Sequence, residues 1–317
     1  MTRALSCLSA ALLMTLAVAA QQPFDPQGRP NRNQPGPWYN DVLVYRVGTG
    51  CAGERVATFP RAGVPTAARL ADGRIIAAHQ HFPDDSDADF DKVAVHFSAD
   101  EGRTWTPAQV IRLSGLPDGM RFPFDPTLVP LPDGRVRLYF TSVAGRRIDL
   151  SPPAIYSAIS SNGIDFVVEP GVRFAVAGRM VIDSAVVLHR GVFHLYSPDN
   201  GPAGPPPAPG PGGPGRGPAG PVGVGYHATS ADGLTFTRQD DVRIDGNRRW
   251  LGNAQSDGEQ IRFFGTGGPG VWTATSADGQ AWRLDRSLPV PGADPGAVAI
   301  KNGGWLVVAT GPPRRRL

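Results

Sequence analysis

The sequence predicts an all-β fold, a five-bladed β-propeller whose blades have four strands each. Two repeated patterns and the composition lead to this prediction. Short apolar hairpins that turn on a glycine recur five times, and a polar turn closed by an aromatic residue recurs four times. The 317-residue chain contains 40 Gly and 33 Pro, a content that disfavours helices and favours short strands joined by turns.

The chain opens with a segment typical of a secretory signal peptide. Residues 1–20 begin with a basic residue, Arg3, continue with a short apolar stretch and end in the small residues "AVAA". We expect cleavage after Ala20, an extended segment over 21–39 and a secreted or periplasmic protein without a membrane span. Cleavage also removes one of the two cysteines and leaves Cys51, so no internal disulfide is expected.

Each of the five hairpins has apolar residues on both sides of its turn. Asp-Gly and Asn-Gly between alternating apolar residues are strong hairpin signals, because such turns need positive φ. The turn glycines are 45 to 67 residues apart, which suits four-stranded propeller blades. They are Gly73, Gly134, Gly191, Gly258 and Gly303.

The last hairpin belongs to a unit that is too short for a complete blade. The residues after Gly303 suffice for one further strand, and a blade without its outer strands would expose an unpaired edge. Two runs near the N-terminus, "DVLVYRV" (41–47) and "ERVATF" (54–59), can supply the missing strands. We therefore expect the two ends of the chain to complete one blade, so that residues 40–317 form a single domain.

One segment, residues 202–221, falls outside the repeat. It consists mainly of Gly and Pro without the strict three-residue period of collagen, and it has no apolar side chains to bury in a core. Its length accounts for the larger number of residues in its unit compared with the next unit. The segment is therefore predicted to be a disordered loop insertion within a blade and not a domain boundary.

The polar turn is most complete in "HFSADEGRTW" (96–105). Ser98 and Asp100 can bond nearby backbone N–H groups, Gly102 can take positive φ, and Trp105 can pack between sheets. Shorter copies end at Phe166, Phe236 and Trp282. The turn resembles the Asp-box, or BNR repeat, of the sialidase-like β-propeller superfamily. This resemblance implies a structural turn on the outer rim, away from the active site.

Candidate catalytic residues precede the innermost strands, because propellers commonly bind ligands where these strands begin. Three units have an aspartate at matching places: Asp125, Asp183 and Asp294. Three units have an arginine four residues before an Asp or Asn, in the pairs Arg121 with Asp125, Arg179 with Asp183, and Arg249 with Asn253. Residues four apart on an extended strand point the same way. We therefore expect the acids to ring one mouth of the channel, with the arginines farther out.

Acids that lie close together raise the pKa of at least one of them. Such a cluster combines a proton donor with an ionised partner, which is the arrangement that glycoside hydrolysis commonly uses. An equally simple structural interpretation is that the aspartates and arginines bond neighbouring blades together.

The first unit contains a second candidate region, "HQHFPDDSDADFD" (79–91). Its alternating acids include Asp85 and resemble a calcium loop, but the Gly and the bidentate Glu of such a loop are missing. His79 and His81 alternate on one strand face without a third ligand spaced to join them. A solvated acidic loop is the simpler interpretation. No cofactor is expected to be required, and Ca2+ binding here is the alternative.

The first unit also resembles the first blade of sialidases, from "GVPTAARLADGRIIAAHQ" (63–80) to the polar turn. In that family an Arg-Ile-Pro motif binds the carboxylate of sialic acid, and an Asp in the next loop is the general acid. Here the motif reads Gly63-Val64-Pro65, with Arg61 close by, and Asp85 is one of the acids that would fill the second role. Nominees for the Tyr nucleophile and Glu partner of the family are Tyr226 and Glu259.

In its number of blades the chain resembles a different group, the five-bladed furanosidase-type glycosidases. Sialidases have six blades, whereas this chain has five units. The furanosidase group uses two Asp and one Glu at the starts of successive inner strands. In this sequence Asp183 stands where the resemblance implies Glu, and the first unit has no acid at that place.

The leading hypothesis is a secreted, sialidase-like glycoside hydrolase that acts on a terminal sugar at the channel mouth. Asp125 and Asp183 would be acid/base or nucleophile, and Asp294 would tune their pKa. Sugar-binding residues would be Arg61, Arg121, Arg179, Arg249, Asn253 and Trp250. The alternatives are a non-catalytic propeller that binds a glycan or protein, and a polysaccharide lyase. The net charge of +3 gives no indication of nucleic-acid binding.

Overall fold

The computed structural model describes residues 32, 36–49, 53–145, 151–203, 220–268, 270–301 and 303–314. Its contacts divide the chain into Met1–Gln34 and Pro35–Leu317, and the fold below belongs to the second unit. The predicted signal peptide, Cys51 and most of the Gly/Pro-rich insertion lie outside the described residues. Within the described ranges, no helix is long and apolar enough to cross a membrane.

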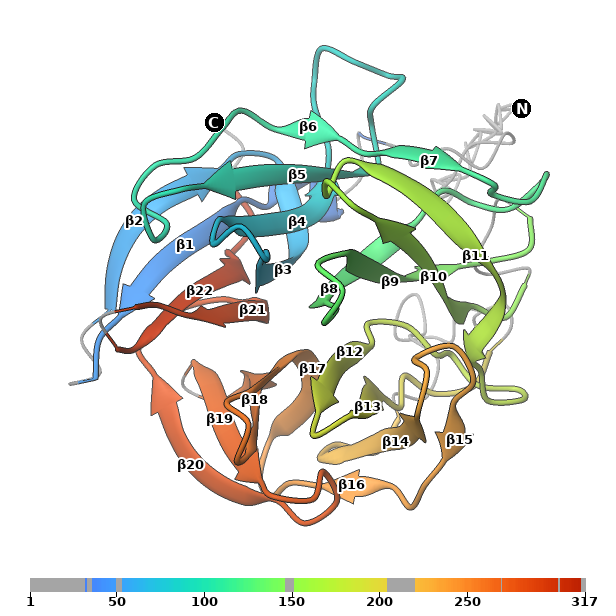
Figure 1. Ribbon diagram of the computed structural model, residues 1–317, viewed down its shortest axis with the longest axis vertical. Coiled ribbons are helices and arrows are strands. Elements are labelled where there is room, and N and C mark those ends of the chain that lie inside the picture. The colour runs from blue at the N-terminus through green and yellow to red at the C-terminus, as the bar shows by residue number, and fades with distance from the viewer. Residues whose placement is uncertain are drawn as a thin grey trace, which may run out of the picture. The chain divides into compact units, whose positions relative to one another are not determined.

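Five sheets stand around a common centre and confirm the predicted five-bladed propeller (Figure 1). The first blade contains β3 (Ala62–Arg69), β4 (Ile75–His81), β5 (Lys92–Ser98) and β6 (Gln109–Val110). The second contains β8 (Phe124–Pro130), β9 (Val136–Ser142), β10 (Ala154–Ser160) and β11 (Asp165–Phe174), with β7 (Arg112–Ser114) parallel to β11 at its edge. The third contains β12 (Ala185–His189), β13 (Val192–Pro198), β14 (Val224–Ser230), β15 (Thr237–Arg238) and β16 (Val242–Arg243).

The fourth blade contains β17 (Arg248–Ser256), β18 (Ile261–Gly267), β19 (Val271–Ser276) and β20 (Arg283–Leu288). The fifth contains β21 (Ala293–Ala299), β22 (Trp305–Thr310), β1 (Val42–Val47) and β2 (Gly53–Phe59), in the order β2-β1-β22-β21. The prediction that the N-terminal strands complete the last blade is therefore confirmed. Residues 37–39 differ from the expected extended segment: Pro37–Tyr39 is a 3-10 helix, and its Trp38 packs against Phe82 and Phe90.

The hydrophobic core lies between the blades. In the described part of the chain, five clusters of buried residues each join two neighbouring blades. One of them contains Val44 of β1, Ile75 of β4 and Leu306 of β22, all without exposed surface. Because each strand face is buried against the next blade, the ring is stabilised by the same apolar packing all the way round.

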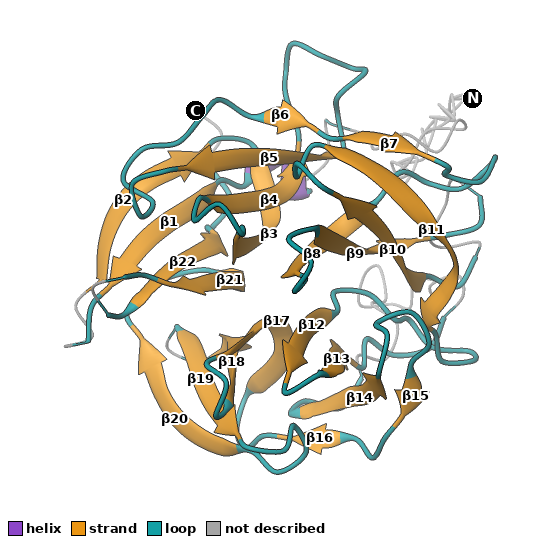
Figure 2. Ribbon diagram, in the orientation of Figure 1, coloured by secondary structure: helices purple, strands orange, loops and turns teal. Residues whose placement is uncertain are grey.

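The polar turns connect the third and fourth strands of four blades (Figure 2). In the first, Ser98 Oγ accepts from the amide of Gly102, and Asp100 accepts from the amides of Arg103 and Thr104, as the sequence predicts. The closing aromatic packs on the preceding blade, where Trp105 meets Phe59 edge-on at a ring-centroid distance of 5.3 Å.

The direction of the strands fixes where these turns lie. The third strand of an antiparallel blade runs parallel to the first, so the turn that follows it is at the end where the innermost strand finishes. The opposite end, where β3, β8, β12, β17 and β21 begin, is called the mouth below. The polar turns therefore fasten blades at the end remote from the mouth.

Candidate active site at the mouth

The innermost strands begin in an unusual backbone conformation. Val64, Asp125, Asp183 and Asp294 occupy equivalent places in four blades, and each has a φ between 48° and 56°. Three of these starts coincide with a β-bulge, such as the register shift between Phe124 and Thr127. Asp tolerates the left-handed region better than most residues, and bulges re-aim side chains. Local backbone geometry thus explains why aspartates occur here and why they face the channel.

This geometry corrects one expectation from the sequence. Arg121 and Asp125, like Arg179 and Asp183, were expected to point the same way along an extended strand. The left-handed residue interrupts the strand instead, and both arginines precede the regular strand. The Arg side chain and the Asp side chain of each pair therefore lie in different surroundings.

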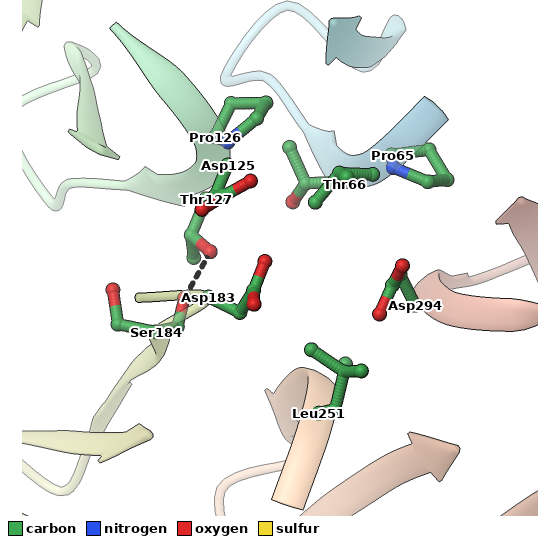
Figure 3. Close-up of a pocket in the computed structure, with 11 residues that line it drawn as sticks. Pro65, Thr66, Asp125, Pro126, Thr127, Asp183, Ser184, Leu251 and Asp294 are labelled. Atoms are coloured by element: carbon green, nitrogen blue, oxygen red, sulfur yellow. Dashed lines mark hydrogen bonds between the residues drawn. The ribbon is translucent and has the colours of Figure 1, made fainter. Parts of the chain in front are cut away.

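A small pocket that is open to solvent occupies the mouth. Figure 3 shows that the carboxyl groups of Asp125, Asp183 and Asp294 point into this space from three different blades. The remaining lining residues are Val64, Pro65, Thr66, Pro126, Thr127, Ser184, Leu251 and Gly252. The structure therefore brings the three predicted acids together at one site.

Three threonines that sequence reasoning missed hold the strand starts. The amide of Asp183 donates to Thr141 Oγ1 at 3.3 Å, that of Asp294 to Thr266 Oγ1 at 2.8 Å, and that of Val64 to Thr310 Oγ1 at 2.8 Å. Each threonine ends or nearly ends the second strand of the preceding blade. The available signal was a Thr seven or eight residues after a hairpin glycine in three of the five units.

Burial controls the ionisation of the three acids. Asp125 is only 7% exposed, while Asp183 and Asp294 keep part of their surface open to the pocket. Desolvation raises the pKa of Asp125 to about 6, against the opposing effects of hydrogen bonds from Asp183 and Thr141 and of the Arg121 charge. Desolvation and the Asp125 charge raise the pKa of Asp294 to about 7, with Arg249 opposing.

The pKa of Asp183 is raised as well. Burial raises its pKa well above the ordinary value, and the charges of Asp125 and Asp294 and the hydrogen bond to Asp125 add to this effect. Asp125 and Asp183 are thus a coupled pair of carboxyl groups, and burial favours the protonated form of both. Across the pocket, Asp294 Oδ1 is buried without a hydrogen-bond partner among the described residues. The arrangement supplies a proton donor and a separate, unengaged carboxyl oxygen.

The predicted arginines lie outside the pocket lining, and three of them are paired with carboxylates. Arg61 contacts Asp84 at 2.5 Å and Arg121 contacts Asp91 at 2.6 Å, while Arg179 bonds Asp199 and the Tyr226 hydroxyl. Arg249 differs, because its Nη2 donates to a neutral partner, Asn200 Oδ1, at 2.9 Å.

The fourth blade departs from the predicted alignment. A register shift between Arg249 and Gly252 places Leu251 and Gly252 in the pocket lining, so Asn253 is displaced along the strand. Asn253 is 1% exposed and accepts a bond from Gln255, its neighbour on the same strand. A side chain at Gly252 would place its Cβ 2.1 Å from the Phe264 carbonyl oxygen, which explains the glycine. Among its described residues, this blade contributes no acid to the pocket.

Trp250 was predicted to stack on a sugar, and the structure corrects this. Its ring has no exposed surface, lies 5.1 Å from the Trp282 ring centroid, and donates through Nε1 to the Gly223 carbonyl. Trp250 therefore has no face left for a ligand and packs between the third and fourth blades.

The first-blade candidates do not join the pocket either. Asp85 is exposed on the loop after β4. Glu259, a nominee from the fourth blade, is exposed at the tip of the hairpin between β17 and β18. Buried His79 pairs with His96, with 3.0 Å between their Nε2 atoms. Over the described residues, no group of three or more His, Cys, Asp or Glu side chains is arranged to hold a metal ion.

No protein-family model matches the chain, and no curated protein matches it in sequence. The structure is similar to solved glycoside hydrolases. Zg3597, a family 117 glycoside hydrolase from the marine bacterium Zobellia galactanivorans, is 12% identical with a TM-score of 0.53 over 85% of this chain and 83% of that chain. The GH43_1 enzyme from Xanthomonas citri, solved with xylotriose, is 17% identical with a TM-score of 0.53 over 78% and 87%.

The GH32 β-fructofuranosidase BmSUC1 of Bombyx mori is 12% identical with a TM-score of 0.53, over 87% of this chain and 63% of that chain. At these identities the similarity is one of fold. The chain has the five-bladed architecture that these glycoside hydrolases share.

Proposed function

We propose that this chain is an exported glycoside hydrolase that cleaves a terminal sugar in the mouth pocket. The observation that carries the proposal is the set of three carboxyl groups, from three blades, around one pocket. Their raised pKa values differ, so the site can hold a protonated and an ionised carboxyl group together near neutral pH. The signal-peptide pattern of residues 1–20 supports export.

The three acids take different roles. Asp183 donates its proton to the oxygen of the leaving group, because burial and the charges of Asp125 and Asp294 raise its pKa well above the ordinary value. Asp294 supplies the second carboxylate that glycoside hydrolysis requires, either as base toward water or as nucleophile, and its pKa of about 7 suits that role. Asp125 helps to keep the acid protonated, because its charge raises the pKa of Asp183.

Arg249 supports a sialidase-like preference for a sugar that bears a negative charge. Arg121 and Arg179 are neutralised by Asp91 and Asp199, whereas the partner of Arg249 is an uncharged amide. The charge of Arg249 lowers the pKa of both Asp183 and Asp294, so its field reaches the pocket. A carboxylate on the substrate would gain a charge-assisted hydrogen bond from this guanidinium group.

The test is turnover of fluorogenic glycosides, including a sialoside, an arabinofuranoside and a xyloside. Asp183→Asn and Asp294→Asn should each lower kcat by at least about 100-fold, since each removes a proton-transfer group. Asp133→Asn is the matched control, because Asp133 is exposed at a hairpin remote from the mouth. Asp85→Asn distinguishes a general acid in the pocket from one in the first-blade loop. A loss of activity in that variant alone would place the acid in the loop and overturn the assignment of Asp183.

The alternative of a non-catalytic glycan-binding propeller has one observation in its favour. Two of the five strand starts offer the pocket no carboxyl group: the first blade lines it with Val64, Pro65 and Thr66, and the fourth with Leu251 and Gly252. In that case glycan binding measured by calorimetry would be retained in Asp183→Asn, and no glycoside of the panel would be cleaved by the parent protein.

A further inference from the structure

Two buried histidines of the first blade face each other through their Nε2 atoms. His79 lies on β4 and His96 on β5, and the two residues are 1% and 6% exposed. Their Nε2 atoms are 3.0 Å apart. On the other side of each ring, Nδ1 meets a backbone carbonyl oxygen, that of Gln80 at 2.9 Å from His79 and that of Thr106 at 2.7 Å from His96. All three contacts have the length of a hydrogen bond.

The protons of these two rings can be counted. A carbonyl oxygen only accepts, so the Nδ1 atom of each ring must carry a proton. A neutral imidazole has a single N–H, so two neutral rings would direct bare lone pairs at each other across 3.0 Å. A neutral ring of the other tautomer, or a ring turned over by 180°, loses its carbonyl contact instead. One additional proton between the two Nε2 atoms satisfies all three contacts at once.

The distance between the Nε2 atoms also distinguishes a proton from a metal ion. Bonds from zinc to imidazole nitrogen are about 2.0 to 2.1 Å long, so two nitrogens at a tetrahedral zinc lie about 3.3 Å apart or more. The pair is closer than that. His81 is the third histidine of the blade, yet within the described ranges no three such side chains are arranged to hold a metal ion. The geometry therefore fits a shared proton.

A second pair of stacked histidines, in the third blade, shows an arrangement that needs no additional proton. His194 Nδ1 lies 3.1 Å from His227 Nε2, and His227 Nδ1 lies 2.8 Å from Gln280 Oε1. The amide nitrogen of Gln280 donates to the Asp240 carbonyl oxygen, which leaves Oε1 for the histidine. Each neutral ring then donates from Nδ1, and His227 Nε2 accepts. Both pairs join the second and third strands of their blades, so the third-blade pair is a natural control.

The surroundings of the first-blade pair oppose further protonation. Burial lowers the pKa of His79 to about 3 and also lowers the pKa of His96, and the charge of His81 acts in the same direction on both. Asp85 and Asp89, on the loop after β4, raise the pKa of His81 against the effect of its burial. These effects exclude a second proton on the pair. The first proton is favoured by the hydrogen bond that it forms between the rings.

The two rings lie where three parts of the molecule meet. Phe59 of the fifth blade stacks on His96 with 3.9 Å between the ring centroids, a position that favours a cationic imidazole. Thr106, whose carbonyl oxygen faces His96, directly follows Trp105 of the polar turn. The chain then enters β6, which pairs with β5 through two residues. The contact between the rings therefore connects the turn and the short outer strand to the interface with the fifth blade.

We propose that His79 and His96 bind one proton between them, and that loss of this proton loosens the segment between the polar turn and β6. Without the proton, one ring must change its tautomer or turn over, and it loses its contact with Gln80 or Thr106. The outer edge of the first blade is thus a pH-sensitive element of the fold. The proposal does not depend on catalysis in the mouth pocket.

The experiment is a pH titration of the protein labelled with 15N at its six histidines, followed by NMR of the imidazole nitrogens. His79 and His96 should titrate in one common step that takes up a single proton for two rings. This step should occur at a higher pH than any step of His194 and His227, because protonation adds a hydrogen bond to the first pair. The third-blade pair, in which burial lowers the pKa of His194 to about 4, should stay neutral through the common step.

Hydrogen exchange of the backbone amides of residues 104–110 measures the second part of the proposal. After correction for intrinsic rates, their exchange should become about tenfold faster as the pH rises through the common step, since one hydrogen bond is lost. His96→Gln removes one ring of the pair, so the common step should disappear and exchange should be fast on both sides of it. His227→Gln is the matched control: it should loosen residues 279–282 and leave both the common step and residues 104–110 unchanged.

Three outcomes would overturn the proposal. His79 and His96 could titrate at separate midpoints, both could stay neutral at every pH at which the protein is folded, or the common step could leave the exchange of residues 104–110 unchanged. Should His96→Gln not fold, Phe59→Leu removes the stacked ring and keeps all three hydrogen-bonding groups. It should move the common step to lower pH, and an unmoved step would contradict a cationic ring beside Phe59.

Discussion

Asp294 illustrates at the scale of one residue how the site and the stability of the fold are coupled. Burial raises its pKa to about 7 from an ordinary value of 3.8, and its Oδ1 has no hydrogen-bond partner among the described residues. A carboxyl group whose pKa rises on folding binds more protons in the folded state between those two values. Stability therefore falls as the pH rises from about 4 to about 7.

We expect Asp294→Asn to raise the midpoint of thermal unfolding at pH 8 by about 2 to 4 °C, on the order of 1 kcal/mol. The neutral amide avoids the burial of a charge. The gain should shrink as the pH is lowered to about 4.5, where the native carboxyl group is itself protonated. Scanning calorimetry at pH 4.5, 6 and 8 measures this.

Asp133→Asn serves as the comparison in the same scans. Arg135 lowers the pKa of exposed Asp133, so its ionised form does not oppose folding at pH 8 and its replacement should bring no gain. A midpoint for Asp294→Asn that is unchanged or lower at pH 8 would mean that the buried charge is compensated in a way the structure does not show.

At the scale of single elements, the polar turns connect neighbouring blades through their glycines. Gly279 has a φ of +79°, and a Cβ there would lie 2.4 Å from His194 Nδ1 on the preceding blade. The hydroxyl group of Tyr196, also on that blade, donates to the Gly279 carbonyl oxygen at 2.9 Å. The turn therefore needs glycine for two reasons, its backbone conformation and its close approach.

Gly279→Ala should lower the free energy of unfolding by about 2 to 4 kcal/mol, since left-handed strain and a steric clash add together. Gly258→Ala has the same left-handed strain, with a φ of +91°, but a Cβ there meets nothing within 4 Å. Its cost should be about 1 kcal/mol. Equilibrium unfolding in urea compares the two, and equal losses would show that the close approach to His194 is not tight.

The sequence was most informative where structure depends on local chemistry. Hairpin glycines such as Gly134 and turn residues such as Ser98 and Asp100 predicted the blades, because positive φ and side-chain caps are properties of short segments. The left-handed φ of Asp125 and Asp183 was not foreseen, because an Asp before an apolar run also reads as the start of an extended strand.

The missed parts of the site depend on contacts between blades. Thr141 and Thr266 act on residues of the next blade, and no alignment within one unit reveals such a bond. A register shift in β17 places Leu251 at the pocket, where Asn253 was expected. An alignment of the units on the hairpin glycine could not locate that shift. Trp250 was misread because a tryptophan near a strand start is equally consistent with a ligand platform and with the interface between blades.

The molecule as a whole depends on the blade that is built from both ends of the chain. The β1 strand pairs with β22 along its full length, from Val42 opposite Thr310 to Val47 opposite Trp305. Val44 and Leu306 of these strands are buried in the cluster shared with the first blade. The ring is therefore closed by backbone hydrogen bonds and apolar packing between segments far apart in the sequence.

A chain that begins at Arg61 should not form a stable monomer, because β22 would be left as an exposed edge strand with its apolar face uncovered. We expect aggregation in size-exclusion chromatography and no cooperative unfolding by circular dichroism. Adding a synthetic peptide of residues 36–60 during refolding should restore both properties. A fragment that is monomeric and unfolds cooperatively without the peptide would contradict this prediction. It would show that four blades and the β21–β22 pair suffice for a stable fold.

The closing blade also determines where anything attached to the protein would be placed. The amide of Gly311 donates to the Asp41 carbonyl oxygen and that of Arg314 to the Tyr39 carbonyl oxygen, so the two ends of the propeller leave it side by side. Both leave it at the mouth, because Ala293 and Val42 are the register partners of Thr310. A reporter or bead attached directly at Tyr39 or Arg314, the ends of the propeller itself, would crowd the entrance to the pocket. For immobilisation, the hairpin around Asp133 and Gly134 is the better anchor, since it presents the pocket to the solution.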